Sequence, residues 1–328
     1  MMTTSSRETI LQMFRETPSG FLSGAQISKE LGVSRTAVWK QIEALRDLGY
    51  VVEAVPSRGY HLLQSPDLLS AEELRAGLGE QLIGCDIRTF GETDSTNVQA
   101  MALGEEGAPE GTVIVADRQT AGKGRLGRRW ISPGGVNLYV SVLLRPAVLP
   151  AEAPLLTFLS AVAVCRAVAE ISGLQPTVKW PNDILLNGSK IAGLLNEMSS
   201  ETDRVNYVVL GIGVNLNMTA DQIPTQLRYP ATSLAVETGE PVSRLAFARE
   251  LLRQLDVLYQ GYRKDGARPV LSAWEAYCAL TGKSIEVDCQ DRVIKGIMAG
   301  LDDDGALLVK TATGLERVLA GDVRPAGR

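Results

Sequence analysis

The residues with the clearest chemical potential are three cations in a glycine-rich loop. Gly122-Lys-Gly-Arg-Leu-Gly-Arg128 carries Lys123, Arg125 and Arg128. Glycine lets the backbone approach a ligand closely, and lysine and arginine bind anions. The loop also fits the G-x-G-x-x-G pattern of a dinucleotide-binding turn, which requires a helix directly after it. Pro133 and the two glycines behind it exclude that helix. The loop is therefore predicted to bind another phosphate or carboxylate compound.

Two further segments place cations, amides and glycines at the ends of apolar strands. Lys179-Trp-Pro-Asn-Asp183 combines a cation, a rigid Trp-Pro turn that can wall a ligand, an amide and a carboxylate. Lys190 follows seven residues later and opens a strand that contains Gly193. Gly211-Ile-Gly-Val-Asn215 ends another strand with small residues and an amide. Each feature alone is typical of a strand cap with a surface lysine, but their occurrence together with the cationic loop favours an anion-binding site.

A third segment, Thr93-Asp-Ser-Thr-Asn97, is predicted to begin a helix. Short hydroxyl and amide side chains at this position cap helices. They equally offer donors and acceptors to a small polar ligand. This motif alone does not distinguish a helix cap from a ligand-binding segment.

Composition excludes several classes of function. His61 is the only histidine, so catalysis by Ser-His-Asp or Cys-His and multi-histidine metal sites are excluded. The four cysteines are scattered, as is typical of buried thiols in a reducing compartment. The net charge of −5 argues against coating nucleic acid or membranes by bulk electrostatics. The longest largely apolar run, 153–165, is shorter than the roughly 20 residues of a membrane span. Without a signal-peptide pattern, we expect a cytoplasmic protein.

The first 64 residues have the pattern of a winged helix-turn-helix module. Helices are expected at 7–16, from the cap Ser23 to Leu31, and over 35–48, followed by a hairpin turned at 56–59. Bases in the major groove are contacted from the start of a recognition helix. The predicted DNA contacts are Arg35, Thr36, Trp39 and Lys40, with Arg58 at the wing. Because the module is nearly neutral, a role in protein contacts stays open.

The rest of the chain is predicted to form two further domains. Residues 65–280 alternate helical and strand patterns, as in a mixed α/β domain, with strands at 111–117, 137–144, 176–180, 184–187, 191–197 and 205–212 and helices near 94–104, 153–172 and 243–264. Residues 281–328 hold four short strands separated by Asp-Gly-type turns, which is typical of a small β-barrel. The fold class is thus α+β and multidomain.

Taken together, these motifs resemble the biotin–protein ligase family, in its bifunctional form that is also the biotin operon repressor. The resemblance covers nearly the whole chain, and its most specific parts are 122–128, 179–183 and 190–193 in this order and spacing. It implies a central domain of the class II synthetase type and a C-terminal SH3-like barrel. The family condenses biotin with ATP to biotinyl-5′-adenylate (biotinyl-AMP) and then transfers biotin to a lysine of a biotin carboxyl carrier protein domain.

The resemblance also assigns roles to individual residues. It places biotin on Ser95, Thr96, Asn97, Gln119, Lys123, Gly124, Arg125, Lys190 and Gly193. It places the nucleotide on Arg128, Trp130, Asn182 and Asn215. Two departures stand out: Lys123 replaces an arginine that is frequent in the family loop, and residues 216–236 lack the tryptophan that covers adenine in some repressors. Tyr229 or aliphatic side chains are the candidates to replace it.

The expected chemistry fits these residues. A carboxylate attacking the α-phosphorus joins two anions, so cations must offset the repulsion and stabilise the transition state. Arg125 and Lys190 are predicted to do so, with support from Lys179. No general base is required, because the carboxylate is already ionised. Mg²⁺ is expected to arrive with ATP, and Asp183 is the nearest carboxylate for it. The glycine loop is expected to close over the reactive anhydride as a lid.

Three functional hypotheses remain open at this point. The first is a ligase that is also a DNA-binding repressor, with biotinyl-AMP favouring a homodimer on a two-fold operator. The second is a ligase whose winged helix does not bind DNA. The third is a regulator that senses a small molecule without catalysis, against which the retained Arg125, Lys179 and Lys190 argue. A lipoate ligase shares the chemistry, but the motifs favour biotin, and no membrane association is expected.

Overall fold

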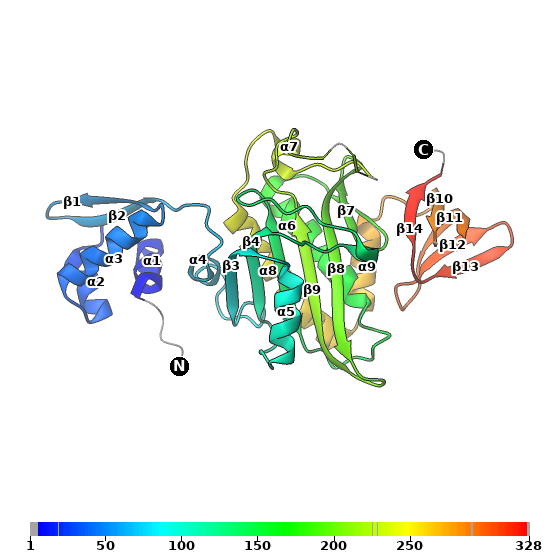
Figure 1. Ribbon diagram of the computed structural model, residues 1–328, viewed down its shortest axis with the longest axis horizontal. Coiled ribbons are helices and arrows are strands. Elements are labelled where there is room, and N and C mark those ends of the chain that lie inside the picture. Colours follow the sequence, from blue (N-terminus) through cyan, green and yellow to red (C-terminus); the bar gives the residue numbers. More distant parts are fainter. Residues whose placement is uncertain (1–5, 19, 225, 228, 290, 327–328) are drawn as a thin grey trace. The chain divides into compact units, whose positions relative to one another are not determined.

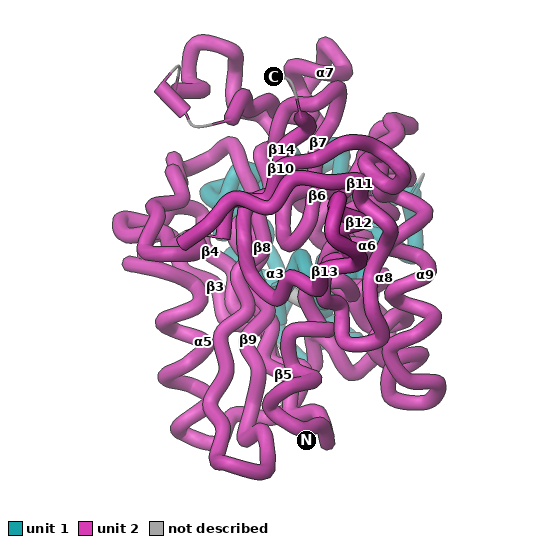
Figure 2. Tube along the Cα trace, turned by 90° about the vertical axis from the view of Figure 1, so that its right-hand side faces the viewer, with its two compact units in different colours: residues 1–77 teal, residues 78–328 magenta. Residues whose placement is uncertain are grey.

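The computed structural model describes residues 6–18, 20–224, 226–227, 229–289 and 291–326. The chain divides into two compact units, Met1–Gly77 and Leu78–Arg328, which Figure 2 colours separately. The ligand-binding motifs all belong to the second unit.

Unit 1 contains the winged helix-turn-helix elements. These are α1 (Ser6–Glu16), α2 (Gly24–Leu31), α3 (Arg35–Asp47), β1 (Val51–Val55), β2 (Gly59–Gln64) and α4 (Ala71–Arg75). Ser23 caps α2 in a capping box, Ser34 caps α3, and Gly32 ends α2 in the left-handed conformation, as predicted. Apolar side chains on one face of each helix form the core, among them Ile10, Ile27 and Ile42.

A buried ionic cluster attaches α4 to this core. Glu73 on α4 is 1% exposed and accepts hydrogen bonds from Arg15 and from the hydroxyl of Tyr50. Burial and the adjacent Glu73 carboxylate raise the pKa of Tyr50, so the tyrosine stays a donor. Because α4 packs through Glu73, unit 1 extends beyond residue 64, where the sequence analysis ends the winged helix.

In the described part of unit 2, the main sheet has seven strands in the order β3-β4-β5-β9-β8-β7-β6. Their bounds are β3 (Ile87–Thr93), β4 (Val113–Gln119), β5 (Leu138–Leu144), β6 (Thr177–Lys179), β7 (Asp183–Leu186), β8 (Ser189–Ser200) and β9 (Val205–Val214). Only the β3–β4 pair among them is parallel. The β5 side chains are all buried, as expected for a strand covered on both faces.

Helices cover both faces of this sheet. Figures 1 and 2 show α5 (Thr96–Glu105) on one face and α6 (Leu155–Ser172) with α8 (Arg244–Asp265) on the other. The short α7 (Leu234–Thr238) and α9 (Arg268–Tyr277) complete the helices described here. Helix α6 is long and apolar enough to cross a membrane by those criteria alone, but 67% of it is buried in the protein. It therefore serves as a core helix.

The C-terminal part of unit 2 is a second, antiparallel sheet of five strands among the described residues, in the order β13-β12-β11-β10-β14. It consists of β10 (Ser284–Asp288), β11 (Val293–Leu301), β12 (Leu307–Thr311), β13 (Gly314–Val318) and β14 (Asp322–Pro325). Four of these strands were predicted, and β14 was not. Buried Ile285, Val287, Leu307 and Val309 form its apolar interior.

The buried carboxylate of Glu73 generates a stability prediction. Glu73→Ala leaves the Arg15 guanidinium and the Tyr50 hydroxyl without their acceptor, so we expect the exchange free energy of α3 amides to fall by about 3 kcal/mol. Hydrogen exchange on the full-length protein measures this. Glu43→Ala removes a half-buried ion pair with Arg46 on the surface of α3 and serves as the control, expected within about 0.5 kcal/mol of the parent. Equal effects of the two substitutions would contradict the role of the cluster.

Candidate active site

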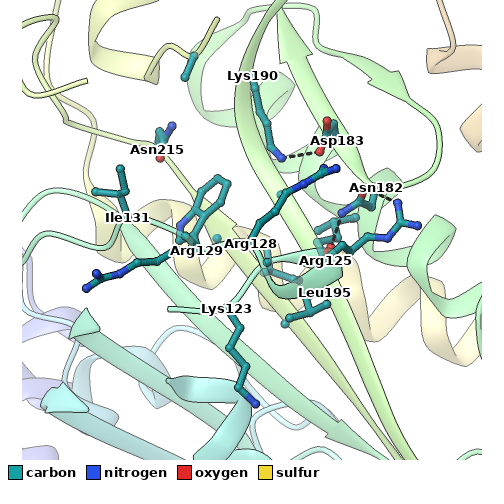
Figure 3. A pocket seen from close by; sticks show the side chains of 18 of the residues that line it. Lys123, Arg125, Arg128, Arg129, Ile131, Asn182, Asp183, Lys190, Leu195 and Asn215 are labelled. Atoms are coloured by element: carbon teal, nitrogen blue, oxygen red, sulfur yellow. Dashed lines mark hydrogen bonds and ion pairs between the residues drawn. The ribbon is translucent and has the colours of Figure 1, made fainter. Parts of the chain in front are cut away.

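A cavity of about 260 Å³ opens on the α5 side of the main sheet, under the glycine loop (Figure 3). The sequence motifs meet there. Its lining includes Ser95, Thr96, Asn97, Gln119, Lys123, Gly124, Arg125, Arg128, Trp130, Asn182, Asp183, Lys190, Gly193 and Asn215. These residues come from the start of α5, the end of β4, the glycine loop, the β6–β7 turn, β8 and the end of β9.

Polar groups at the start of α5 form the floor of the cavity. Gln119 at the end of β4 accepts hydrogen bonds from the backbone N–H (2.8 Å) and hydroxyl (3.2 Å) of Thr96. Ser141 on β5 lies 2.8 Å from the Thr96 hydroxyl and donates to Asn97 Oδ1 at 2.6 Å. Ser95 occupies the cap position of α5 but makes no capping bond with its side chain. Its hydroxyl is therefore suited to a ligand, whereas Thr96 and Asn97 are already held by protein groups.

Glycines make room for the larger side chains of the site. A Cβ atom on Gly213 would lie 2.6 Å from the Trp130 indole, and one on Gly193 would lie 2.9 Å from it. A Cβ on Gly211 would collide with the Asn97 side chain. The small residues of β8 and β9 thus form the surface on which Trp130 and Asn97 lie. Nε1 of Trp130 is buried and has no hydrogen-bond partner among the described residues, so this donor remains unsatisfied.

One carboxylate holds two lysines at the edge of the cavity. Asp183 Oδ1 lies 2.5 Å from Lys190 Nζ, and Oδ2 lies 3.1 Å from Lys179 Nζ. Burial raises the pKa of the Asp183 carboxyl, but the charges of Lys190 and Lys179 outweigh it and lower the pKa. Lys179 is 7% exposed, and its Nζ lies 3.7 Å from the ring centroid of Tyr229. The cluster carries one net positive charge, which suits an anionic ligand.

The contacts of Asp183 with the two lysines also bear on its predicted role as a ligand for Mg²⁺. Both of its oxygens are engaged by lysines. Within the described ranges, no group of three or more His, Cys, Asp or Glu side chains is placed to hold a metal ion. Asp183 is therefore an ion-pair partner in this arrangement and does not fit the predicted role toward Mg²⁺.

The glycine loop is anchored at its three cations. Arg125 donates to Asn182 Oδ1 at 3.2 Å, and Lys123 Nζ lies 3.6 Å from Glu197 on β8. Arg128 binds both oxygens of Asp322 on β14, at 2.6 and 3.4 Å. Desolvation lowers the pKa of Arg125, yet a guanidinium stays protonated at neutral pH. A single 3-10 turn follows Gly124, so the exclusion of a dinucleotide-binding helix is confirmed.

Asn182 and Asn215, which are predicted to contact the nucleotide, also make hydrogen bonds within the protein. Asn215 Nδ2 donates to the carbonyl of Thr232 at 3.1 Å, and Asn182 Nδ2 donates to that of Leu194 at 2.7 Å. Both side chains line the cavity. They hold the surrounding loops in place and keep only part of their hydrogen-bonding capacity for a ligand.

One interpretation of the Trp-Pro turn is wrong. Trp180 does not wall the cavity; it is 2% exposed, and its Nε1 donates at 3.2 Å to the carbonyl of Gly305, in the turn between β11 and β12 of the C-terminal sheet. The bond between Trp180 and Pro181 is cis. The turn therefore anchors the C-terminal sheet beside the site, and Trp130 supplies the aromatic wall. Lys179 is not part of the cavity lining and contacts it through Asp183 and Tyr229.

The predicted DNA contacts share the outer surface of unit 1. Arg35, Thr36, Trp39 and Lys40 are exposed at the start of α3, and Trp39 is 51% exposed. The Arg58 guanidinium lies 4.0 Å from the ring centroid of Phe21. Phe21 also contacts the ring of His61, at 5.1 Å between centroids. This arrangement holds Arg58 at the wing in a defined position.

Comparison with known proteins decides the family. The bifunctional ligase/repressor BirA of Bacillus spizizenii is 40% identical over 322 residues, which cover 98% of this chain and 99% of that protein. This chain belongs to the bifunctional ligase/repressor family. BirA of Escherichia coli K12 is 33% identical over 304 residues, covering 92% of each chain. The resemblance drawn from the sequence motifs is thereby confirmed.

Family models and a solved structure agree on the parts of this bifunctional ligase/repressor. Models described as an HTH domain, the biotin/lipoate A/B protein ligase family and the biotin protein ligase C-terminal domain match residues 6–61, 90–215 and 281–324. The biotin protein ligase from Aquifex aeolicus in complex with biotin and ATP aligns with a TM-score of 0.64 at 29% identity, covering 74% of this chain and all of that one. The predicted fold class is confirmed.

Several residues of the site escaped the sequence analysis of this family member. Asp322 reaches the site from β14, and Glu197 binds the glycine loop from β8. Ile223, Pro224 and Leu227 line the cavity from the segment after β9. Neither acidic residue had a local signal, because Asn196 precedes Glu197 and Arg324 lies two residues after Asp322. The segment after β9 was considered as cover for adenine, but no local pattern distinguishes these three residues within it.

The glycine surface under Trp130 yields a further prediction. Gly213→Ala should destabilise the protein by about 1–3 kcal/mol, because the new methyl group overlaps the indole. Gly261→Ala is the matched control, since a Cβ there meets nothing within 4 Å and helix propensity favours alanine by about 0.5–1 kcal/mol. Urea unfolding measures both changes. Destabilisation by Gly261→Ala equal to that by Gly213→Ala would show that the contact is not the cause.

Proposed function

We propose that this protein is an ATP-dependent biotin–protein ligase that forms biotinyl-5′-AMP, transfers biotin to a carrier-protein lysine and represses transcription in response to the intermediate. The main support for this proposal is the cavity under the glycine loop. It brings together the ion cluster of Asp183 with its two lysines, the Arg125 guanidinium and an aromatic wall. A sensor without catalysis would need none of this phosphate-directed charge. The biotin and ATP bound by the Aquifex aeolicus ligase support the choice of substrates.

In the proposed first step, a carboxylate oxygen of biotin attacks the α-phosphorus of ATP. The bond from that phosphorus to the bridging oxygen breaks, and pyrophosphate leaves. Lys190 Nζ and the Arg125 guanidinium stabilise the negative charge that spreads over the phosphoryl oxygens. Lys179 acts indirectly, by sharing Asp183 with Lys190. The floor residues Ser95, Thr96, Asn97 and Gln119 orient biotin, and Gly193 lets the ligand approach β8 closely.

In the proposed second step, the acceptor lysine of the carrier domain attacks the acyl carbon of biotinyl-AMP. The bond from that carbon to the phosphate oxygen breaks, AMP leaves, and the amine loses a proton to solvent. The anhydride must be shielded from water until the carrier arrives. Lys123, Gly124 and Arg125 belong to the loop that can order over it as a lid.

The nucleotide is proposed to lie between the loop and the segment after β9. Arg128, Trp130, Asn182 and Asn215 are the proposed contacts, and all line the cavity. Tyr229, Ile223 and Leu227 lie in the same lining and supply the apolar cover for adenine. Mg²⁺ would enter with the ATP phosphates; the lysine-bound Asp183 does not supply a ligand for it.

The repressor activity is proposed to rest on the helix-turn-helix of unit 1. Arg35, Thr36, Trp39 and Lys40 would enter the major groove of operator DNA, and Arg58 would contact the backbone or minor groove. We further propose that biotinyl-AMP favours a homodimer, because a two-fold operator requires two copies of the recognition helix. Such a protein acts in the cytoplasm, where carrier domains and DNA are both present.

A ligase that does not bind DNA is the alternative. The exposed Trp39 on the recognition helix is the observation in its favour, because aromatic residues are enriched in protein–protein interfaces. A mobility shift on the protein's own biotin-gene promoter, with and without biotinyl-AMP, separates the two. A shift that requires biotinyl-AMP supports the repressor, and no shift in either condition supports the alternative.

The proposed role of Lys190 predicts a large kinetic effect. Lys190→Ala should lower biotin-dependent exchange between ATP and pyrophosphate by about 10²- to 10³-fold, because one transition-state cation is lost. Lys295→Ala removes an exposed lysine of the C-terminal sheet and should leave the exchange rate unchanged. Parental exchange in Lys190→Ala would refute this role, and no exchange in the parent would refute the ligase itself.

The proposed DNA contact of Lys40 predicts a change in salt dependence. If Lys40 neutralises one phosphate, Lys40→Ala should reduce the slope of log K against log salt concentration by about 1. Lys29→Ala, an exposed lysine on α2, is the control. Fluorescence anisotropy with operator DNA at several salt concentrations measures the slopes. A parental slope in Lys40→Ala would remove this residue from the interface.

A further inference from the structure

We propose that Glu197 is a positioning residue that ties the glycine loop to the floor of the ligand cavity. This inference rests on the proposed ligase function. Glu197 lies on β8, and no predicted role includes it. Its carboxylate contacts one residue of the floor and one of the loop at the same time.

The first contact fixes the carboxylate. Asn97 Nδ2 donates to Glu197 Oε2 at 2.8 Å and to the carbonyl of Leu195 at 3.0 Å. Asn97 Oδ1 accepts from Ser141 at 2.6 Å, and Asn97 is 4% exposed. Because both the NH₂ group and the oxygen of the buried Asn97 amide are hydrogen-bonded, its orientation is fixed. The bond from Nδ2 then fixes the position of the Glu197 carboxylate.

The second contact reaches the loop. Glu197 Oε1 lies 3.6 Å from Lys123 Nζ, and their side chains are 31% and 46% exposed. Figure 3 shows the Lys123 side chain directed away from Lys190 and Asp183. The loop's other two cations bind Asn182 in the β6–β7 turn and Asp322 on β14. Among the loop contacts described here, the one with Glu197 is therefore the link to the floor.

The position of Glu197 makes it a positioning residue and not a catalytic one. It is absent from the lining of the ligand cavity, and it lines a separate surface hollow formed by residues 120–129 and Leu195. Glu197 thus acts on the ligand only through Lys123 and Asn97. Its loss should loosen the lid while leaving the transition-state cations in place.

Glu197→Gln is the direct test, because its carbonyl still accepts from Asn97 while the charge that holds Lys123 is gone. We expect the KM for biotin in ATP–pyrophosphate exchange to rise about fivefold and bound biotinyl-AMP to dissociate about fivefold faster, the range of an exposed ion pair. The kcat and the thermal midpoint should stay at parental values. Glu286→Gln is the control, since Glu286 also holds two cations, Lys295 and Arg324, but in the C-terminal sheet.

A double-mutant cycle with Lys123→Gln completes the test. Glu197→Gln should have no further effect on the KM or on adenylate dissociation in the Lys123→Gln background. Parental values in Glu197→Gln, or effects that add to those of Lys123→Gln, overturn the inference. If Glu197→Gln does not fold, a parental KM in Lys123→Gln alone also overturns it. Absence of biotin-dependent exchange in the parent refutes the proposed function instead, so the two failures are distinguishable.

Discussion

The site depends on one shared carboxylate. Asp183 begins β7 directly after the Trp-Pro turn and holds Lys190 and Lys179, which would otherwise repel each other at the edge of the cavity. The Asp183 carboxylate offsets this repulsion, and the cluster retains a net positive charge for an anionic ligand. The β6–β7–β8 antiparallel arrangement provides this, because it pairs Lys179 with Asp183 and Asp183 with Gly193, three residues beyond Lys190.

The other parts of unit 2 are arranged around this cluster. The glycine surface of β8 and β9 carries Trp130 and Asn97, so the aromatic wall and the polar floor meet the lysines in one cavity. The glycine loop crosses above and is held by three separate ion or hydrogen-bond contacts. The C-terminal sheet contributes one of these through Asp322 and packs beside the turn through Trp180. Its place beside the site thus has a physical basis in contacts with the loop and with the β6–β7 turn.

The sequence predicted the elements that have strong local signals. Ser23, Ser34 and Gly32 mark helix ends through capping, and the long apolar patterns of α6 and α8 identify core helices. Strand β3 was missed because it is an edge strand with mostly exposed residues, and β14 because it is short and ends at Pro325. The site residues were found where glycines, lysines and amides cluster in sequence. Contacts such as Arg128 with Asp322 join positions far apart in the chain, and no local pattern reveals them.

We infer that Asp183 positions Lys190, and with it Lys179, to stabilise the transition state when the biotin carboxylate attacks the α-phosphorus. Rapid-quench measurement of biotinyl-AMP formation in a single turnover of Asp183→Asn tests it most directly, with circular dichroism to verify the fold. We expect formation to slow about hundredfold at saturating biotin and ATP, because Lys190 loses the ion pair that fixes its position. Formation of biotinyl-AMP at the parental rate by a folded Asp183→Asn variant would contradict it.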